Sequence, residues 1–431
     1  MALFLFIVAL CALVLRPTDF LQLSANYQIF LYAMLCCTLV SADRLLRFAQ
    51  SDELWNVPLT LFVLLLLIFV VLSHAVQANL WHARHWGVEF AKAALFFLLF
   101  VCHASDERKF FVILKWLLCF TVLILILSLL QYFDIIHCSF LEPIPQVSFD
   151  TEGNTILLTR LVGSGTFNDP NDYCLLLNVG FFLTLFFFET ERRLLPKAAL
   201  ALFACLFIGG VFLTQSRGGM MALLGAGMLW MVVKFGIRRS APFLVLALVV
   251  TLFFLSTRRF DLAAQDDTGQ QRIQLWASAL MLFRGSPLFG IGPGNFAESF
   301  GYVVHNSFLH CFTELGYFAG TIFLSCFLYS LIAVYRCSRD YARSGEPLCR
   351  FAPYLLAILT TYCVGLFSIS RAYVIPTYLI LGVANAYLLI THAHVPLRLP
   401  KVNLSGVSIA CAFSITFLGF MHCFVRYFAN Y

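Results

Sequence analysis

The stretch Leu59-Thr-Leu-Phe-Val-Leu-Leu-Leu-Leu-Ile-Phe-Val-Val-Leu72 carries no charged side chain, and the run from Leu117 to Leu130 is uncharged as well. Apolar runs that approach about 20 residues are typical of transmembrane helices, because a helix satisfies its own backbone hydrogen bonds across roughly 30 Å of hydrocarbon. The chain of 431 residues is 61% hydrophobic and 12% charged, whereas soluble domains average roughly 25% charged residues. The composition therefore excludes a soluble protein.

The cysteines and the net charge exclude two further classes of protein. Most of the 15 cysteines lie inside apolar runs, where cysteine behaves as a small hydrophobe. No paired Cys-x-x-Cys array is present, so the sequence does not indicate a zinc or iron–sulfur site. The net charge of +6 is modest and in a membrane protein reflects the charges of its loops. We expect no nucleic-acid partner, no metal site and no cofactor.

The apolar runs predict an all-α, polytopic transmembrane helical bundle of about 12 to 13 spans, with a large outside loop that carries short helices. The N-terminus is apolar and has neither a basic segment nor a small-residue cleavage site, so we interpret it as a first span. The candidate spans centre near residues 8, 34, 67, 96, 122, 180, 205, 227, 249, 320, 360, 381 and 415.

The distribution of lysine and arginine predicts the orientation in the membrane. With a cytoplasmic N-terminus, most of the 28 Lys and Arg residues fall in short loops on the inside, as the positive-inside rule requires. Two long segments, residues 134–170 and 257–304, then lie outside. The second contains a helix-forming stretch from Arg272 to Phe283 that is suited to lie along the membrane interface. We expect a multi-pass membrane protein whose functional face lies outside.

This organisation divides the chain into three parts. Residues 1–133 are expected to form N-terminal transmembrane helices, residues 134–320 a core that includes both long loops, and residues 321–431 C-terminal transmembrane helices.

Polar side chains and turn residues gather in four segments at span ends that this topology places on one membrane face. They are Arg160 to Asp172, Thr214 to Gly219, Arg272 to Trp276 with Ser286 to Phe296, and His305 to Gly316. Each segment alone is a weak signal. Their convergence on one face indicates a functional site.

Three arginines in these segments are suited to phosphate oxygens, because a guanidinium is planar and permanently charged. They are Arg160, Arg217 and Arg272. An arginine close to a bilayer is costly unless it is paired or faces a wet cavity, and the diphosphate of a lipid-anchored substrate would supply such a partner. The alternative is that each arginine extends to the interface or pairs with a nearby carboxylate such as Asp169 or Glu314.

His305 lies at the start of a predicted span, on the side of the membrane predicted to be outside and beside a long polar loop. A neutral imidazole there is able to take a proton from an acceptor hydroxyl, although a single histidine is more often structural. Glu314 follows His310 by four residues on one helical face, so the pair is either a buried structural tie or part of the site. The glycine-rich segment from Gly290 to Gly294 is either a phosphate-binding nest or a plain turn, and the turn is favoured.

Together these motifs resemble the O-antigen ligase superfamily of polytopic bacterial glycosyltransferases, which includes lipopolysaccharide ligases, polysaccharide polymerases and protein O-oligosaccharyltransferases. The resemblance rests on Arg160 with Gly-Thr-Phe-Asn-Asp-Pro-Asn, on Leu213-Thr-Gln-Ser-Arg-Gly-Gly, on Arg272 and Trp276 with Pro287-Leu-Phe-Gly-Ile-Gly-Pro-Gly-Asn, and on His305-Asn-Ser with Glu314-Leu-Gly316. It covers residues 158 to 320 in order and spacing, and elsewhere the match is only to membrane spans in general.

The resemblance implies a multi-pass enzyme of the bacterial inner membrane, with a large periplasmic loop that caps a periplasmic active site. Such an enzyme transfers a glycan from undecaprenyl diphosphate to an acceptor hydroxyl, without a metal and with inversion of the anomeric centre. It implies that Arg160 and Arg272 hold the donor diphosphate and that His305 activates the acceptor. We expect Arg217, Asn168, Asn306 and Glu314 to contact the substrates. Family ligases have twelve spans with both ends inside, so a thirteenth span here is a departure that would place the C-terminus outside.

Several alternatives remain open at this stage. Within the superfamily, the acceptor is a lipid A core sugar, a second lipid-linked repeat as in a polymerase, or a protein serine; the first two are favoured because no separate protein-docking domain is evident. A different class is a transporter that carries an anionic substrate past the arginines. Transporters usually show repeated halves and polar residues near the midplane, and neither feature is evident here. A purely structural scaffold leaves the outside Arg and His residues without an explanation.

Overall fold

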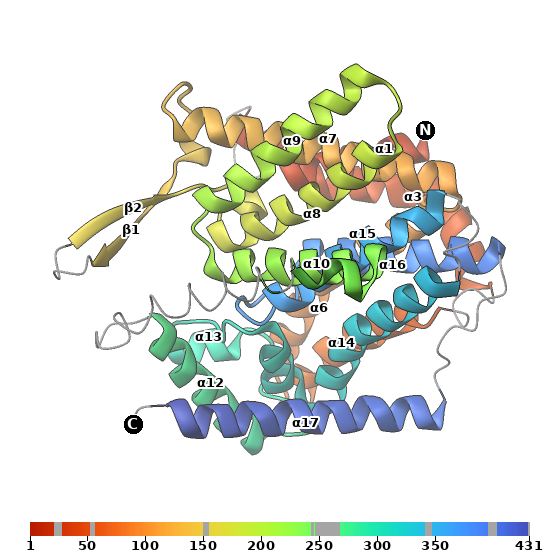
Figure 1. Ribbon diagram of the computed structural model, residues 1–431. Helices are drawn as coiled ribbons and strands as arrows, with labels where there is room; N and C mark the ends of the chain where they lie inside the picture. Colours follow the sequence, from red (N-terminus) through yellow and green to blue (C-terminus); the bar gives the residue numbers. More distant parts are fainter. Residues whose placement is uncertain are drawn as a thin grey trace. The chain divides into compact units, whose positions relative to one another are not determined.

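The computed structural model describes residues 1–20, 28–51, 57–149, 155–242, 245, 268–340, 347–394 and 403–429. Within these residues the chain forms helices almost throughout (Figure 1). It divides into two compact units, each made of three separate stretches of chain. Unit 1 is Met1–Arg47, Cys102–Phe260 and Cys337–Gly365, and unit 2 is Phe48–Val101, Asp261–Arg336 and Leu366–Tyr431.

The predicted membrane spans are confirmed as helices wherever the structure describes them. Ten helices of the described residues are long and apolar enough to cross a membrane, and two shorter apolar helices, Ala2–Leu15 and Leu59–Ala75, coincide with two further predicted spans. The span predicted near residue 249 lies outside the described residues. The protein is therefore a multi-pass helical membrane protein. The division into three functional parts stays a prediction.

Unit 1 contains most of the N-terminal half of the chain and one helix from further on. Its helices are α1 (Ala2–Leu15), α2 (Pro17–Phe20), α3 (Ile29–Ala49), α7 (Glu107–Tyr132), η1 (Ser139–Leu141), η2 (Gly165–Phe167), α8 (Pro170–Thr190), α9 (Leu194–Leu213), α10 (Arg217–Phe235) and α15 (Pro347–Gly365). Helix α8 packs against α7, α9, α10 and α15. Hydrogen bonds between buried polar groups stabilise this packing. The Tyr173 hydroxyl donates to Ser128 Oγ at 3.1 Å, and Asn178 Nδ2 donates to the Gly219 carbonyl at 2.9 Å.

The loop of residues 134–170, predicted to lie outside, contains an antiparallel hairpin that was not predicted from the sequence. Strand β1 (Ile144–Phe149) pairs with β2 (Thr155–Arg160) in the register Ile144 opposite Arg160. Figure 1 shows the two strands extending away from the helices of unit 1. The end of β2 is joined to the end of α9, because the Leu161 backbone N–H donates to the Leu213 carbonyl at 3.0 Å. The hairpin therefore returns the chain to the helices at Arg160.

Unit 2 consists of α5 (Leu59–Ala75), most of α6 (Leu80–His103), α12 (Thr268–Gly285), α13 (Asn295–Phe300), most of α14 (Ser307–Asp340), α16 (Ile375–His394) and α17 (Leu404–Phe428). The predicted helix around Arg272 to Phe283 is confirmed as α12, which lies against α17 (Figure 1). Helix α16 packs on α5, where Asn385 Nδ2 donates to Thr60 Oγ1 at 2.7 Å and both side chains are buried. The short α13 together with α12 confirms that the loop of residues 257–304 carries helices.

Helix α14 is broken at Gly316, whose φ of 82° and ψ of −175° are not helical. The break leaves carbonyl groups without their helical partners, and the preceding loop pairs with them: Ile291 N donates to Thr313 O at 3.0 Å and Gly292 N to Glu314 O at 2.8 Å. After the break, Tyr317 N donates to Pro287 O at 2.8 Å. Interrupted backbone inside a membrane protein is tolerated where other protein groups satisfy it. A side chain at position 316 would meet the Leu288 carbonyl oxygen at 2.2 Å, so glycine is required there.

Candidate active site

Arg160 is held by the second polar segment, within unit 1. Its Nε donates to the Thr214 carbonyl at 2.9 Å, and its Nη2 donates to Asn171 Oδ1 at 3.2 Å. The Ser216 hydroxyl donates to the same Asn171 oxygen at 2.8 Å. These bonds orient the guanidinium plane from two sides. A guanidinium that is fixed in this way is suited to bind two phosphate oxygens at once. The structure thus brings the first and second polar segments together.

The neighbouring residues of these two segments divide between helix caps and exposed groups. Asp169 caps α8, since its Oδ1 accepts from Asn171 N at 2.8 Å and from Asp172 N at 3.3 Å, and Pro170 follows at the first helical position. Asn168 is exposed, and Arg217 is exposed at the first turn of α10. The structure therefore places both predicted substrate-binding residues where a ligand is able to reach them.

In unit 2, the third and fourth polar segments are also brought together. Trp276 Nε1 donates to the Val304 carbonyl at 3.0 Å, and Thr313 Oγ1 donates to the Ala279 carbonyl at 3.2 Å. These bonds fix α12, which carries the half-buried Arg272, to the chain that leads into α14 and to its first turns. That all four segments lie on one membrane face stays a prediction.

His305 has an unusual backbone conformation immediately before α14. Its φ is 56°, in the left-handed region that residues other than glycine rarely adopt. The conformation is held by its own backbone N–H, which donates to Ser370 Oγ at 2.9 Å. The next turn is tied to the same loop, because the Ser307 hydroxyl donates to the Ile369 carbonyl at 2.6 Å. Backbone strain of this kind concentrates at functional sites, so the geometry supports a functional role for His305.

Asn306 caps α14 and keeps one donor available. Its Oδ1 accepts from the backbone N–H groups of Phe308 and Leu309, both at 3.1 Å. The side chain is fully buried, and among the described residues its Nδ2 has no hydrogen-bond partner. A buried amide without a partner costs about 1–3 kcal/mol, and a substrate oxygen would satisfy it. This observation supports the predicted substrate contact of Asn306.

Glu314 is fully buried, and its carboxylate is engaged with the chain itself. Oε1 accepts from Gly294 N at 3.0 Å and from Phe296 N at 3.4 Å, while Oε2 lies 2.9 Å from His310 Nε2. The carboxylate thus fixes the turn that precedes α13. For Glu314 the geometry supports the structural tie, the alternative to substrate contact left open by the sequence.

The glycine-rich segment that Glu314 holds is a packed turn. Gly290, Gly292 and Gly294 all have positive φ, and the backbone N–H groups of residues 290, 292 and 294 donate to Ser286 O, Glu314 O and Glu314 Oε1. A side chain at Gly290 would meet the Glu314 backbone at 2.3 Å. Helix α5 holds the turn as well, because His74 Nε2 lies 3.0 Å from the Pro293 carbonyl. These bonds use the N–H groups that a phosphate nest would need, so the favoured interpretation as a turn agrees with the geometry.

We expect Glu314→Gln to lower the free energy of unfolding by about 2 kcal/mol, because a charged acceptor of two backbone N–H groups and a partner of His310 is replaced by a neutral amide. The measurement is thermal unfolding in detergent. The matched control is Glu298→Gln, since that side chain is 66% exposed and lies 3.7 Å from His82, and it should change stability by less than about 0.5 kcal/mol. If Glu314→Gln leaves the melting temperature unchanged and raises KM, Glu314 contacts the substrate and is not a structural tie.

The structure adds residues that the sequence analysis did not single out, in the loop between α15 and α16. The Arg371 backbone N–H donates to the Ser307 hydroxyl at 2.8 Å, and the Tyr373 ring lies 5.5 Å from the His310 ring. Burial, and next to it the charge of Glu314, raises the pKa of Tyr373 well above its usual range, so the phenol stays protonated. The signal in the sequence was the polar run Ser368-Ile-Ser-Arg-Ala-Tyr373 between two spans.

Comparison with known proteins agrees with these motifs. Residues 200–324 match a family model described as O-antigen ligase. No curated protein matches the chain. Of the residues predicted for the site, Arg160 and Asn168 lie before the matched range, which contains Arg217, Arg272, His305, Asn306 and Glu314. Residues 200–324 of this multi-pass membrane protein are thus similar to the O-antigen ligase family.

Proposed function

We propose that the protein transfers a glycan from undecaprenyl diphosphate to an acceptor hydroxyl on the periplasmic face of the bacterial inner membrane. The observation that carries the proposal is His305, which lies within the O-antigen ligase match, in a left-handed conformation pinned by Ser370, and immediately before the buried Asn306 amide. A histidine whose backbone is fixed in one conformation is suited to acid–base chemistry on a bound hydroxyl.

In the proposed reaction, His305 takes the proton of the acceptor hydroxyl while the hydroxyl oxygen attacks the anomeric carbon of the donor glycan. The bond between that carbon and the diphosphate oxygen breaks, and undecaprenyl diphosphate leaves with both bonding electrons. Attack opposite the leaving group inverts the anomeric centre. The family resemblance assigns Arg160 and Arg272 to the diphosphate, where fixed cations stabilise the charge that develops on the leaving oxygen. No step in this scheme requires a metal or an organic cofactor.

The fixed guanidinium of Arg160 supports its part in this proposal. Its Nε and Nη2 are oriented by the Thr214 carbonyl and the Asn171 side chain. A pre-oriented cation stabilises a transition state without reorganisation during the reaction. Arg217 and Asn168 are exposed next to these residues in the sequence and are proposed to contact the same donor.

The experiment that tests the function is reconstitution in liposomes that contain an undecaprenyl-diphosphate glycan and one of three acceptors. The acceptors are a lipid A core, additional donor alone, and a pilin-type protein, and the products are identified by mass spectrometry. We expect the lipid A core to gain the mass of the glycan. Lengthening of the donor glycan alone would identify a polymerase, and modification of the protein would identify a protein O-oligosaccharyltransferase. An intact donor in all three mixtures, with uptake of an anionic solute, would identify a transporter and overturn the proposal.

A further inference from the structure

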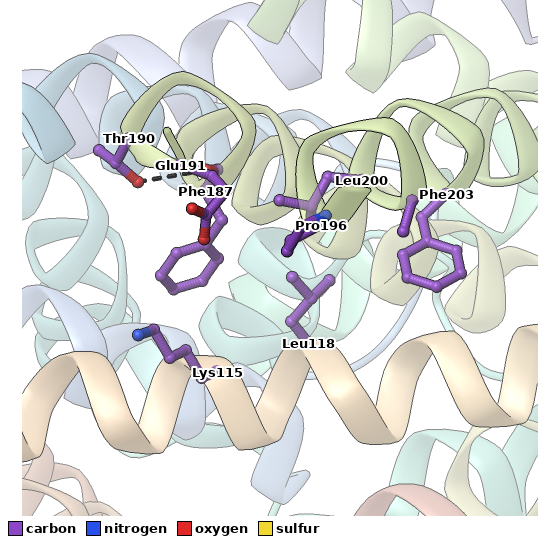
Figure 2. Close-up of a pocket in the computed structure, with 9 residues that line it drawn as sticks. Lys115, Leu118, Phe187, Thr190, Glu191, Pro196, Leu200 and Phe203 are labelled. Atoms are coloured by element: carbon purple, nitrogen blue, oxygen red, sulfur yellow. Dashed lines mark hydrogen bonds between the residues drawn. The ribbon is translucent and has the colours of Figure 1, made fainter. Parts of the chain in front are cut away.

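A pocket of about 550 Å³ lies in unit 1, between the middle of α7 and the turn that joins α8 to α9. Figure 2 shows Lys115 and Leu118 of α7 on one side of the pocket, and Phe187, Glu191, Leu200 and Phe203 of α8 and α9 on the other. None of these residues belongs to the predicted active site. The lysine and arginine distribution predicts that the α8–α9 turn lies on the cytoplasmic side, opposite to the predicted catalytic face.

The pocket has an apolar wall and a cationic rim. Leu118, Leu200 and Phe203 line its apolar part. At the rim, Lys115 Nζ lies 5.8 Å from the centre of the Phe187 ring, and the neighbouring Lys197 Nζ lies 4.9 Å from the Phe188 ring. An aromatic face holds an ammonium group in position by cation–π attraction and leaves it able to bind an anion.

The turn beside the pocket adds two further cations and contains one carboxylate. Arg192 and Arg193 are exposed there. Glu191 Oε1 accepts from the backbone N–H groups of Arg192 and Arg193, both at 2.9 Å. The bond from Arg193 N is the main cause that lowers the pKa of Glu191, so this carboxylate stays charged and occupied with the turn. The charges of Lys115 and Arg193 both act on the Glu191 carboxylate, and Arg192 and Lys197 follow Glu191 closely in the chain.

The N-terminus of α9 also contributes positive charge beside the pocket. Arg193 is its N-cap residue, and no side chain caps the first turn. The N-terminus of a 20-residue helix carries a partial positive charge. Together with the four cations, this terminus makes the rim attractive to an anion, while the apolar wall beneath it is suited to a hydrocarbon chain.

We propose that this pocket binds an anionic phospholipid, with its phosphate at the rim formed by Lys115 and the α8–α9 turn and an acyl chain along Leu118, Leu200 and Phe203. Basic pockets between transmembrane helices on the cytoplasmic side are suited to anionic lipid headgroups. A free phosphate ion would use the rim but would leave the apolar wall uncovered. The apolar lining therefore favours a lipid, and charge complementarity favours an anionic lipid over a zwitterionic one.

Native mass spectrometry of the purified protein tests this proposal, after equilibration with equal amounts of phosphatidylglycerol and phosphatidylcholine. We expect the wild-type protein to retain phosphatidylglycerol in preference to phosphatidylcholine. Lys115→Ala should lower that preference roughly fivefold, which corresponds to about 1 kcal/mol for one cation near a membrane surface. Lys109→Ala is the matched control, because Lys109 lies on the same helix and is already paired with Asp106 at 2.5 Å, and it should leave the preference unchanged.

A second variant tests the apolar wall independently of charge. Ala199 lines the pocket, and Ala199→Trp should fill it and prevent retention of phosphatidylglycerol while the cations remain. A phosphatidylglycerol with a photoreactive acyl chain should label peptides that contain Leu118 or Phe203 in the wild-type protein and not in this variant. The proposal is overturned if the two lipids are retained equally, if the control lowers the preference as much as Lys115→Ala does, or if inorganic phosphate displaces the lipid completely. Glycan transfer is not part of these measurements, so they succeed or fail independently of the proposed function.

Discussion

Replacing His305 with alanine is expected to lower the rate of glycan transfer by about 10² to 10⁴-fold, the range that a general base contributes. The expectation rests on the position of His305 at the entrance to α14, where Ser370 holds its backbone and the Asn306 amide lies next in the chain. Transfer is measured in proteoliposomes as the amount of glycan gained by the acceptor per unit time. Protein level in the membrane and thermal unfolding are measured in the same preparations.

Because His305 has a left-handed backbone, a second variant is able to separate its role in the backbone from its role in the chemistry. Alanine at a φ of 56° is strained, whereas asparagine adopts that region more readily than other residues with a side chain. His305→Asn should therefore keep wild-type stability and still lose transfer, because an amide does not accept a proton at neutral pH. Substantial transfer by His305→Asn would show that the residue serves the backbone conformation and not the chemistry.

Replacing Arg160 with alanine is the second large expected effect, a loss of about 10² to 10³-fold in kcat, as for removal of one fixed donor to a developing negative charge. Two of its nitrogen atoms are oriented by Thr214 and Asn171, so the position of the guanidinium is set by the protein. We expect the same direction of effect for Arg272→Ala, since the resemblance assigns that residue to the same diphosphate.

Arg160→Lys separates geometry from charge. A lysine keeps the charge but lacks the planar fork that matches two phosphate oxygens, so this variant should recover less than about a tenth of the lost rate. Arg84→Ala is the control, because Arg84 is exposed and belongs to none of the four polar segments; its transfer rate should equal that of the wild-type protein. Full activity of Arg160→Ala with normal membrane insertion would remove this residue from the mechanism.

The sequence was sufficient to predict the helices because each span is a long, continuous apolar run. Every predicted span centre within the described residues falls in a helix of the structure. The hairpin of β1 and β2 was missed for the opposite reason. Its strands are six residues long and lie in a polar loop, where a short alternating pattern is a weak signal beside helices of 20 residues.

The detail of the site could be predicted only in part. The four polar segments were visible in the sequence because they combine turn residues with Arg, His and Asn at span ends. The bond between Glu314 and Gly294 was not predictable, because it joins residues 20 positions apart. The role of Ser370 was hidden for the same reason, since it bonds His305 across 65 positions of the chain. Pairings at such separations depend on the packing of helices and not on local sequence.

Release of undecaprenyl diphosphate measures most directly whether the protein breaks the bond between a glycan and this lipid. Purified protein in liposomes is given the donor and the lipid A core acceptor, and undecaprenyl diphosphate is quantified together with the glycosylated acceptor. We predict that one undecaprenyl diphosphate appears for each glycan transferred with the wild-type protein and that neither product forms with His305→Asn. If the donor remains intact with the wild-type protein in the presence of each of the three acceptors, the protein does not break this bond.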